Sequence, residues 1–293
     1  MHSIERLASG VYLEGLAIDH QRGAVWYSDV VAGGVHGLME DGTARALNPQ
    51  RRFTGGILLN DDGAVLSSGG GGIMWNHPDS GQSGWLLDRI DGAPISGVNE
   101  MCPDGNGGIF FGSCDIERIA AGETPRPSAI YRLTVDGEVL LVADDIGFCN
   151  GIALSDDGAH LFCNNTFACT YLFDVAPDLT LCNRRVLLEK EDCDGLALDA
   201  DGNAWITGFS SGHIERVALD GMKLPCIDTP ERAITQVRFG GEDGRDLYFT
   251  AVPADGGENL KKGAPLQGER SHLYRARSAV AGVLVAPTRF ALG

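Results

Sequence analysis

The stretch DGLALDADGNAWITG, residues Asp194 to Gly208, contains the pattern on which the whole chain is built. Apolar residues alternate with other residues on both sides of an Asp-Ala-Asp-Gly turn, as at Leu196 and Leu198 before it. Alternation with a period of two around an Asp/Gly turn is typical of a β-hairpin. The stretch is therefore predicted to form two antiparallel strands, with Asp194 at the start of the first.

The same frame occurs six times along the chain. Each copy has a first residue, here called the leader, a turn-forming residue five positions later and a glycine eight or nine positions later. Successive leaders are 41, 44, 51, 44 and 41 residues apart. The leaders are Glu14, Gly55, Asn99, Asn150, Asp194 and Thr235. A four-stranded unit that repeats about every 40 to 50 residues is typical of a β-propeller.

A second, outer hairpin follows each inner one. Several outer hairpins turn at Asp-Gly, as at Asp136-Gly137 and Asp220-Gly221, which is a strong hairpin signal. Helical patterning is nearly absent. We predict an all-β fold, a six-bladed β-propeller with four antiparallel strands per blade, as a single domain over residues 1–293.

A propeller has to close, because an open ring leaves a free sheet edge. Residues Ile4 to Ala8 are expected to add the outermost strand of the last blade. The sixth outer hairpin is expected in HLYRARSAVAGVLVAP, with Gly282 in its second arm. Two insertions, Cys114 to Ser128 and Pro253 to Arg270, are loop-like and expected near one mouth of the ring.

Composition limits the partners. Hydrophobic residues make up 43% of the 293 residues, which is ample for a core, and the formal net charge is −17. Nucleic acid and anionic membranes repel a chain that is this acidic. Neither is therefore expected as a partner. There is no run of 18 apolar residues and no apolar signal segment at the amino terminus. A small-molecule substrate and a cytoplasmic location are expected, and the oligomeric state stays open.

The eight cysteines contain no CxxC pair, and most of them lie in strand-like runs. Reduced, buried thiols are favoured over a disulfide framework. Cys149 and Cys193 adjoin two leaders, but in a strand neighbouring side chains point to opposite sides, so both are expected to pack away from the channel.

The first strand of every propeller blade lines the central channel, so the six leaders should form a ring. Four of them, Glu14, Asn99, Asn150 and Asp194, carry carboxylate or amide oxygens. Oxygen donors of this kind suit a hard divalent cation, and two carboxylates balance its charge. The alternative is that these side chains merely begin strands and hydrogen-bond one another. A dry ring holding two acids would be costly without a cation, which favours the metal.

The leaders with their flanks, LEG, VNE, CNG and CDG, resemble the gluconolactonase and regucalcin-like family, also called the senescence-marker protein family. The resemblance extends to FGG at Phe239 to Gly241 and to the LYFTA run, and it covers essentially the whole chain. It implies a six-bladed propeller with a single divalent metal in its channel and a lactone-hydrolysing activity, mostly on sugar lactones.

The resemblance also implies roles for individual residues. Glu14, Asn150 and Asp194 match the family's metal ligands, and the position of Asp194 is assigned the general base. Asn99 matches the residue that contacts substrate or a water molecule on the metal, and Glu100 beside it is expected to bind substrate. Ca²⁺ is the expected cation, with Zn²⁺, Mn²⁺, Mg²⁺ or Fe²⁺ as alternatives.

The predicted reaction is therefore opening of a lactone ring to a hydroxy acid by a metal-activated water. The sequence has no serine elbow of the G-x-S-x-G kind. Two alternatives stay open: a different metal-dependent reaction on the same site, such as phosphoester hydrolysis, isomerisation or elimination, and a non-enzymatic calcium-binding or interaction propeller.

One departure from the family concerns the substrate. The family commonly has Arg two residues before its third-blade Asn, in an RxND motif, whereas this chain has Gly97 there and Glu100 in place of the Asp. Losing the arginine removes five hydrogen-bond donors and a charge, and glycine is expected to open space. We predict a bulkier, less polar substrate than a sugar lactone, with Trp75, Phe148 and Phe167 as candidate pocket walls. For Trp75 and Phe148, a place in the ordinary blade core is the alternative.

Overall fold

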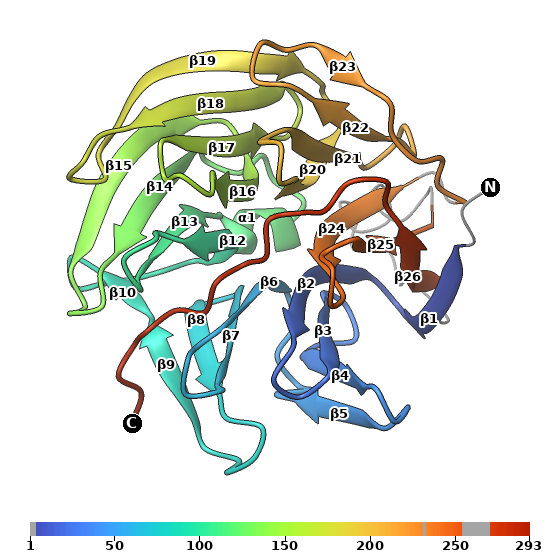
Figure 1. The fold of residues 1–293 in the computed structure, drawn as a ribbon. Helices are drawn as coiled ribbons and strands as arrows, with labels where there is room; N and C mark the ends of the chain where they lie inside the picture. The colour runs from blue at the N-terminus through green and yellow to red at the C-terminus, as the bar shows by residue number, and fades with distance from the viewer. Residues whose placement is uncertain (1–3, 231–232, 254–269) are drawn as a thin grey trace.

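The computed structural model describes residues 4–230, 233–253 and 270–293, and these form a ring of six four-stranded antiparallel sheets (Figure 1). Each sheet is one blade, with its first strand innermost. The predicted fold, an all-β propeller with six four-stranded blades, is confirmed. Among the described residues, no helix is long and apolar enough to cross a membrane.

The first three blades follow one another along the chain. Blade 1 consists of β2 (Leu13–Asp19), β3 (Ala24–Asp29), β4 (Val35–Met39) and β5 (Ala44–Leu47). Blade 2 consists of β6 (Thr54–Leu59), β7 (Val65–Gly69), β8 (Gly72–Asn76) and β9 (Ser83–Leu87). Blade 3 consists of β12 (Val98–Pro103), β13 (Ile109–Ser113), β14 (Ser128–Leu133) and β15 (Val139–Ile146).

The other three blades complete the ring. Blade 4 consists of β16 (Cys149–Leu154), β17 (His160–Asn165), β18 (Cys169–Val175) and β19 (Leu181–Glu189). Blade 5 consists of β20 (Cys193–Leu198), β21 (Ala204–Gly208), β22 (Ile214–Val217) and β23 (Lys223–Leu224). Blade 6 consists of β24 (Ile234–Gly240), β25 (Asp246–Ala251), β26 (Ser271–Arg277) and, from the amino terminus, β1 (Glu5–Gly10).

The amino-terminal strand β1 closes the ring, as expected. It pairs with β26 and completes the sheet order β1-β26-β25-β24. Glu5 lies opposite Arg275, and their side chains form an ion pair of 2.7 Å. This pairing covers the edge of β26 that would otherwise be free.

The expected second arm of the sixth outer hairpin is wrong, because β1 already occupies the edge of β26. Residues 279–293, here called the strap, instead cross the ring over the centre of the channel, as the red segment in Figure 1 shows. The strap is tied to the far ends of first strands: Val283 N–H donates to Leu198 O over 2.9 Å, and Thr288 N–H donates to Leu59 O over 2.8 Å. It therefore closes the mouth opposite the leaders.

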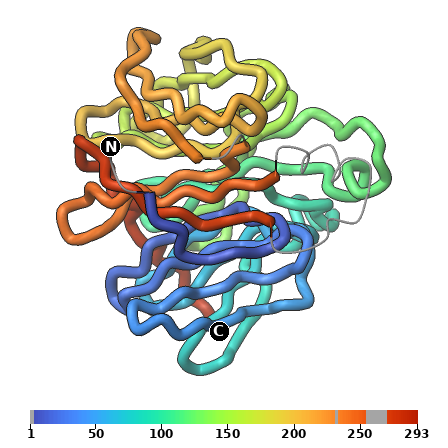
Figure 2. The backbone as a smooth tube through the Cα atoms, turned by 90° about the vertical axis from the view of Figure 1, so that its right-hand side faces the viewer, coloured from blue at the N-terminus to red at the C-terminus, as the bar shows by residue number. Residues whose placement is uncertain are grey.

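Two short elements were not expected from the sequence. The two-stranded hairpin β10 (Arg89–Ile90) and β11 (Ala93–Pro94) precedes blade 3. The helix α1 (Ile116–Ala120) lies in the insertion between β13 and β14. Figure 2 shows this green segment projecting from one face of the ring. The second predicted insertion, Pro253 to Arg270, lies almost entirely outside the described residues.

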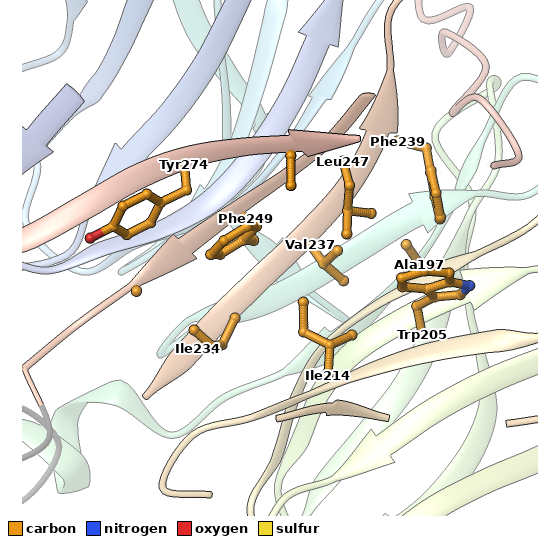
Figure 3. Close-up of a cluster of buried hydrophobic side chains, with 11 residues drawn as sticks. Ala197, Trp205, Ile214, Ile234, Val237, Phe239, Leu247, Phe249 and Tyr274 are labelled. Carbon is orange, nitrogen blue, oxygen red and sulfur yellow. The ribbon is translucent and has the colours of Figure 1, made fainter. Parts of the chain in front are cut away.

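The hydrophobic core lies between neighbouring blades. Figure 3 shows one such cluster, in which Trp205 of blade 5 packs against Phe239 of blade 6. Their rings meet edge to face with centroids 5.2 Å apart, a favoured aromatic geometry. Gly282 of the strap lies against Phe239 so closely that a Cβ atom there would overlap the ring. The strap is thus packed on the same core that joins the blades.

A β-bulge positions each leader. In blade 1 the pairing of β2 with β3 shifts between Leu13 and Leu16, so Glu14 lies in the irregular step. The same shift occurs at the leaders of blades 2 to 5, and blade 6 has one between Ile234 and Gln236. A bulge locally redirects side chains and is frequent beside functional sites. The leaders therefore point differently from regular strand residues.

Polar side chains on the second strands link one bulge to the next. Ser28 accepts a hydrogen bond from Gly15 N–H and donates to Gly55 O of blade 2, both over 2.8 Å. Ser68, Asn164, Thr207 and Thr250 donate in the same way to the leader carbonyl of the following blade. Blade 3 has Gly112 at this position and makes no such bond. These bonds fix the backbone of the leader ring.

Candidate functional site

Four leaders lie together at one mouth of the channel. Glu14 from β2, Asn99 from β12, Asn150 from β16 and Asp194 from β20 all line a cavity of about 720 Å³. Equivalent strands of four blades thus bring together residues that are 180 positions apart at the extremes. The arrangement places two carboxylates and two amides around a common space.

The negative charges of Glu14 and Asp194 are unfavourable in the cavity when no cation is bound. Burial, and then the charge of Glu100, raises the pKa of Glu14 to about 8. Burial, followed by the charge of Glu14, also raises the pKa of Asp194 well above its ordinary value. The Oδ1 atom of Asp194 is buried and has no hydrogen-bond partner among the described residues. A cation bound between them would remove both penalties.

The donor set decides which cation fits. Among the described residues, no three His, Cys, Asp or Glu side chains form a group that could hold a metal ion. The leader ring instead offers two carboxylates and amide oxygens, which are hard donors. Glu14, Asn150 and Asp194 therefore fit a hard divalent cation such as Ca²⁺ better than a soft one.

Hydrogen bonds orient the two amides. Asn150 Nδ2 donates to Thr166 Oγ1 over 3.2 Å, and the Thr166 hydroxyl donates to Cys193 O over 2.6 Å. Asn99 Nδ2 donates to Cys149 O over 3.1 Å. Each amide nitrogen is thereby engaged, which leaves the amide oxygen for a ligand. Thr166 was not identified in the sequence analysis, because it lies in a turn outside the repeated frame.

Glu100 does not line this cavity. Its carboxylate is only 3% exposed and accepts hydrogen bonds from Gln236 Nε2 over 2.9 Å and from Arg238 Nη2 over 3.3 Å. Its position directly after Asn99 in the bulge directs it to the interior of the channel. This placement gives no support to the expected direct contact between Glu100 and substrate.

In three blades, the residue two positions before the leader contributes to the rim of the cavity. Tyr12, Phe53 and Phe148 occupy this position in blades 1, 2 and 4, and all three line the cavity. Phe53 has a φ angle of +54°, an uncommon left-handed conformation for a bulky residue. Tyr12 and Phe53 were missed in the sequence, although the repeated frame contains them at a fixed offset.

Gly97 occupies the same position in blade 3, and the expectation that it opens space is wrong. A Cβ atom at Gly97 would lie 2.3 Å from Cδ1 of Ile116. Ile116 is the first residue of α1, so the insertion fills the volume beside the glycine with an apolar side chain. A short helix of this kind leaves too weak a pattern to be read from the sequence.

The charged residues of the insertion pair with one another. Asp115 forms an ion pair of 2.6 Å with Arg126, and Arg118 forms one of 3.2 Å with Glu123. These contacts hold the insertion around α1, whose Ile116 and Ile119 line the cavity. The insertion therefore contributes two isoleucines to the cavity wall, beside the polar residues Glu123 and Thr124.

Two of the three expected aromatic walls are present. Phe148 and Phe167 line the cavity with ring centroids 6.0 Å apart. Trp75 does not, and this expectation is wrong: it lies on β8, the third strand of its blade, and packs on a core cluster away from the channel. Phe167 is 57% exposed and has a φ angle of +77°. Strained residues of this kind cluster at binding sites.

The cavity carries negative charge and a mainly apolar lining. Its acidic residues are Glu14, Glu123 and Asp194, and no Lys, Arg or His of the described ranges lines it. The remaining lining residues are Tyr12, Val30, Phe53, Gly55, Val98, Asn99, Cys114, Ile116, Ile119, Gly122, Thr124, Pro125, Pro127, Gly147, Phe148, Asn150, Asn165, Thr166, Phe167, Ala168 and Phe209.

The cysteines beside the leaders pack away from the site, as expected. Cys149 Sγ lies 3.4 Å from Cys163 Sγ, and the Cys193 thiol contacts Cys169 O at 3.5 Å. All eight cysteines are unpaired, and six of them are buried. The thiols of Cys149 and Cys193 therefore belong to the core between blades.

The chain matches a known family over most of its length. A family model described as SMP-30/Gluconolactonase/LRE-like region covers residues 13–253. This range begins with β2 and ends after β25, and it contains all six leaders. The match therefore includes every residue of the candidate metal site.

Individual relatives agree with this match. A pentonolactonase of Haloferax volcanii is 25% identical over 272 residues, which cover 88% of each chain. A 6-deoxy-6-sulfogluconolactonase of Pseudomonas putida is 28% identical over 236 residues, or 78% of each chain. The crystal structure of a calcium-binding protein, regucalcin, from Agrobacterium tumefaciens has a TM-score of 0.79 at 19% identity, covering 99% of this chain and 98% of that one. This last likeness shows the fold.

Proposed function

Because the chain belongs to the SMP-30/gluconolactonase/LRE-like family, we propose that it is a metal-dependent lactone hydrolase that opens a cyclic ester to a hydroxy acid. The observation that carries the proposal is the convergence of Glu14, Asn150 and Asp194 on one cavity. The names of the two lactonase relatives support the reaction class.

Glu14, Asn150 and Asp194 are the residues that would hold the cation. When bound, the cation supplies Lewis-acid polarisation of the ester carbonyl and lowers the pKa of an attacking water. Asp194 acts as the general base, because its Oδ1 has no other partner among the described residues and can accept the proton of that water. Water adds to the carbonyl carbon, the ring C–O bond breaks, and the released alkoxide takes up a proton.

The two amides would position the reactants. Thr166 holds the nitrogen of Asn150, so the Asn150 oxygen would be available to hold the cation. Cys149 O holds the nitrogen of Asn99 in the same manner, which leaves the Asn99 oxygen to orient the water or a substrate hydroxyl. Both amides are thus fixed before substrate binds, which lowers the cost of reaching the transition state.

The substrate is proposed to be bulkier and less polar than a sugar lactone. Tyr12, Phe53 and Phe148 form the rim, and Ile116 fills the place beside Gly97. A polyhydroxylated or anionic lactone loses hydration on entry and finds no cationic partner in the described lining. An alkyl- or aryl-substituted lactone instead gains apolar burial there.

A pH-indicator assay of a lactone panel tests the proposal. It compares metal-free protein, protein reconstituted with Ca²⁺ or another divalent cation, and Asp194→Asn treated in the same way. Turnover that requires the cation and is lost in Asp194→Asn is expected. Full activity of protein shown by elemental analysis to contain no metal would overturn the proposal. Cation binding without turnover of any ester would favour the alternative of a non-enzymatic calcium-binding propeller.

A further inference from the structure

A second ring of residues lies directly below the leaders. It consists of the residue that follows each leader: Gly15, Gly56, Glu100, Gly151, Gly195 and Gln236. Only Glu100 of blade 3 and Gln236 of blade 6 have side chains, and in a six-bladed ring these blades face each other. Gln236 Nε2 donates to Glu100 Oε1 over 2.9 Å. The two side chains therefore span the channel.

The glycines of this ring leave the space that the two side chains need. A Cβ atom at Gly56 would lie 2.7 Å from Glu100 Oε1, and one at Gly195 would lie 2.5 Å from Gln236 Oε1. Any larger residue at these positions would displace the bridge. The glycines and the bridging pair are thus complementary parts of one arrangement.

Arg238 completes the bridge from below. Its Nη2 donates to Glu100 Oε2 over 3.3 Å, and its Nη1 donates to Gln236 Oε1 over 2.8 Å and to Leu196 O over 2.7 Å. Glu100, Gln236 and Arg238 are 3%, 1% and 6% exposed. We call these three residues the channel floor. They are a buried, hydrogen-bonded set that joins blades 3, 5 and 6.

The channel floor separates two cavities. The leaders line the large one above, whereas Arg238 lines a smaller cavity of about 180 Å³ below, together with Val283 and Leu284 of the strap. The floor therefore lies between the cavity lined by the leaders and the cavity lined by the strap.

The floor contains one positive and one negative charge. Glu100 directly follows the leader Asn99, and its carboxylate lies against Gly56, which follows the leader of blade 2. Arg238 offsets that charge, and its contact with Glu100 is an ion pair of 3.3 Å. The cation site is thereby left with the charge of its own two carboxylates. Removing the charge of either Glu100 or Arg238 changes the net charge beside the cation site by one unit.

We propose that Glu100, Gln236 and Arg238 form a charge-balanced floor that sets the affinity of the leader ring for a divalent cation. The proposal rests on the proposed metal-dependent function. Glu100 and Arg238 act through Glu14 and Asp194 and are positioning residues. Glu100 thus supports the cation site from below and is not a substrate-binding residue in this proposal.

Calorimetric titration with Ca²⁺ alone tests the floor at pH 8. Glu100→Gln keeps the shape and the hydrogen bond to Gln236 but leaves the Arg238 charge unbalanced beneath the cation. Ca²⁺ affinity is expected to fall at least about tenfold. The double variant Glu100→Gln/Arg238→Met removes both charges and is expected to return to within about threefold of the unmodified protein.

A purely structural role gives the opposite pattern, because the double variant then binds Ca²⁺ no better than the single one. That result, or unchanged affinity in Glu100→Gln, overturns the proposal. Asp104→Asn is the matched control, since Asp104 is a buried carboxylate of the same blade that pairs with Arg132 at 2.8 Å. It is expected to leave Ca²⁺ affinity unchanged, and a loss equal to that of Glu100→Gln would also overturn the proposal.

Arg238→Met provides a second test if Glu100→Gln does not fold. It removes the positive charge and is expected to strengthen Ca²⁺ binding at least about threefold, whereas Arg238→Lys keeps the charge and the affinity. Weaker binding by Arg238→Met overturns the proposal. Failure of the unmodified protein to bind any divalent cation would instead overturn the proposed function, so the two failures are distinguishable.

Discussion

Ile116 Cδ1 lies where a side chain on residue 97 would have to begin: a Cβ atom added to Gly97 would be 2.3 Å from it. The glycine and the isoleucine are therefore a matched pair. Gly97 directly precedes β12, and Ile116 begins α1. The pair makes this corner of the cavity apolar, and it leads to the first prediction.

Gly97→Arg is expected to destabilise the fold by about 1–3 kcal/mol, because the new side chain overpacks against Ile116. Adding Ile116→Ala should recover most of that loss. The double variant should also raise the ratio of kcat/KM for an aldonolactone over an alkyl lactone by at least about tenfold, or ~1.4 kcal/mol. Chemical denaturation and steady-state kinetics measure the two effects. Ile116→Ala alone is the control, and an unchanged ratio in the double variant would refute the matched-pair interpretation.

Phe148 is predicted to bind the apolar part of the substrate. Phe148→Ala should lower kcat/KM for an aryl-substituted lactone by about 10- to 100-fold, since it removes roughly 1.5–3 kcal/mol of apolar contact. An unsubstituted lactone of equal ring size should change by less than about threefold. Leu141→Ala, on the exposed outer strand β15, is the control. If the unmodified protein prefers an aldonolactone by more than about tenfold, the apolar substrate class is wrong.

The leaders could be predicted because they recur in a frame that the fold itself repeats. Glu14, Asn150 and Asp194 share one offset from a turn, and six equivalent first strands must converge on one axis. The rim residues Tyr12 and Phe53 each lie two positions before a leader, so the same reasoning could have identified them. Trp75 was misplaced although its stretch was assigned to an outer hairpin, whose strands lie away from the channel.

Contacts made by unrepeated segments could not be predicted. Ile116 and Thr166 lie in an insertion and a turn whose positions depend on tertiary packing, which no periodicity encodes. The strap was mistaken for a strand because Val283 and its neighbours alternate as a strand would. The edge that such a strand needs was already occupied by β1, and only the closed ring reveals that competition.

Thr166 is predicted to tune the cation site through Asn150. Thr166→Val removes the acceptor that fixes the Asn150 amide and should weaken Ca²⁺ affinity about 10- to 100-fold. Asn150→Ala should weaken it further while Asp194→Asn abolishes turnover, because the latter loses a ligand and the base together. Calorimetry and kinetics at saturating Ca²⁺ separate the two roles. Turnover retained by Asp194→Asn at saturating cation would contradict the assignment of the base.

The cysteines are predicted to be dispensable for turnover. Cys182 lies exposed on β19 and should be alkylated first. Cys114 lines the cavity, but burial raises its pKa to about 12, so at pH 8 it is almost entirely the unreactive thiol. Iodoacetamide should therefore modify Cys182 with little change in activity, as mass spectrometry and an assay of the same sample would show. Rapid inactivation that parallels labelling of Cys182 would count against this view.

The metal-free protein is predicted to lose stability as pH rises. The pKa of Glu14 increases from an ordinary value of 4.5 to about 8 in the fold, so between these pH values the folded state binds more protons than the unfolded chain. The free energy of unfolding must then fall with increasing pH across that window. Saturating Ca²⁺ should remove the decline, and Glu14→Gln should reduce it without cation, leaving the part due to Asp194. Urea unfolding at several pH values with chelator provides the measurement. Stability of the chelated protein that rises from pH 5 to 8 would show that the two buried carboxylates do not need a cation.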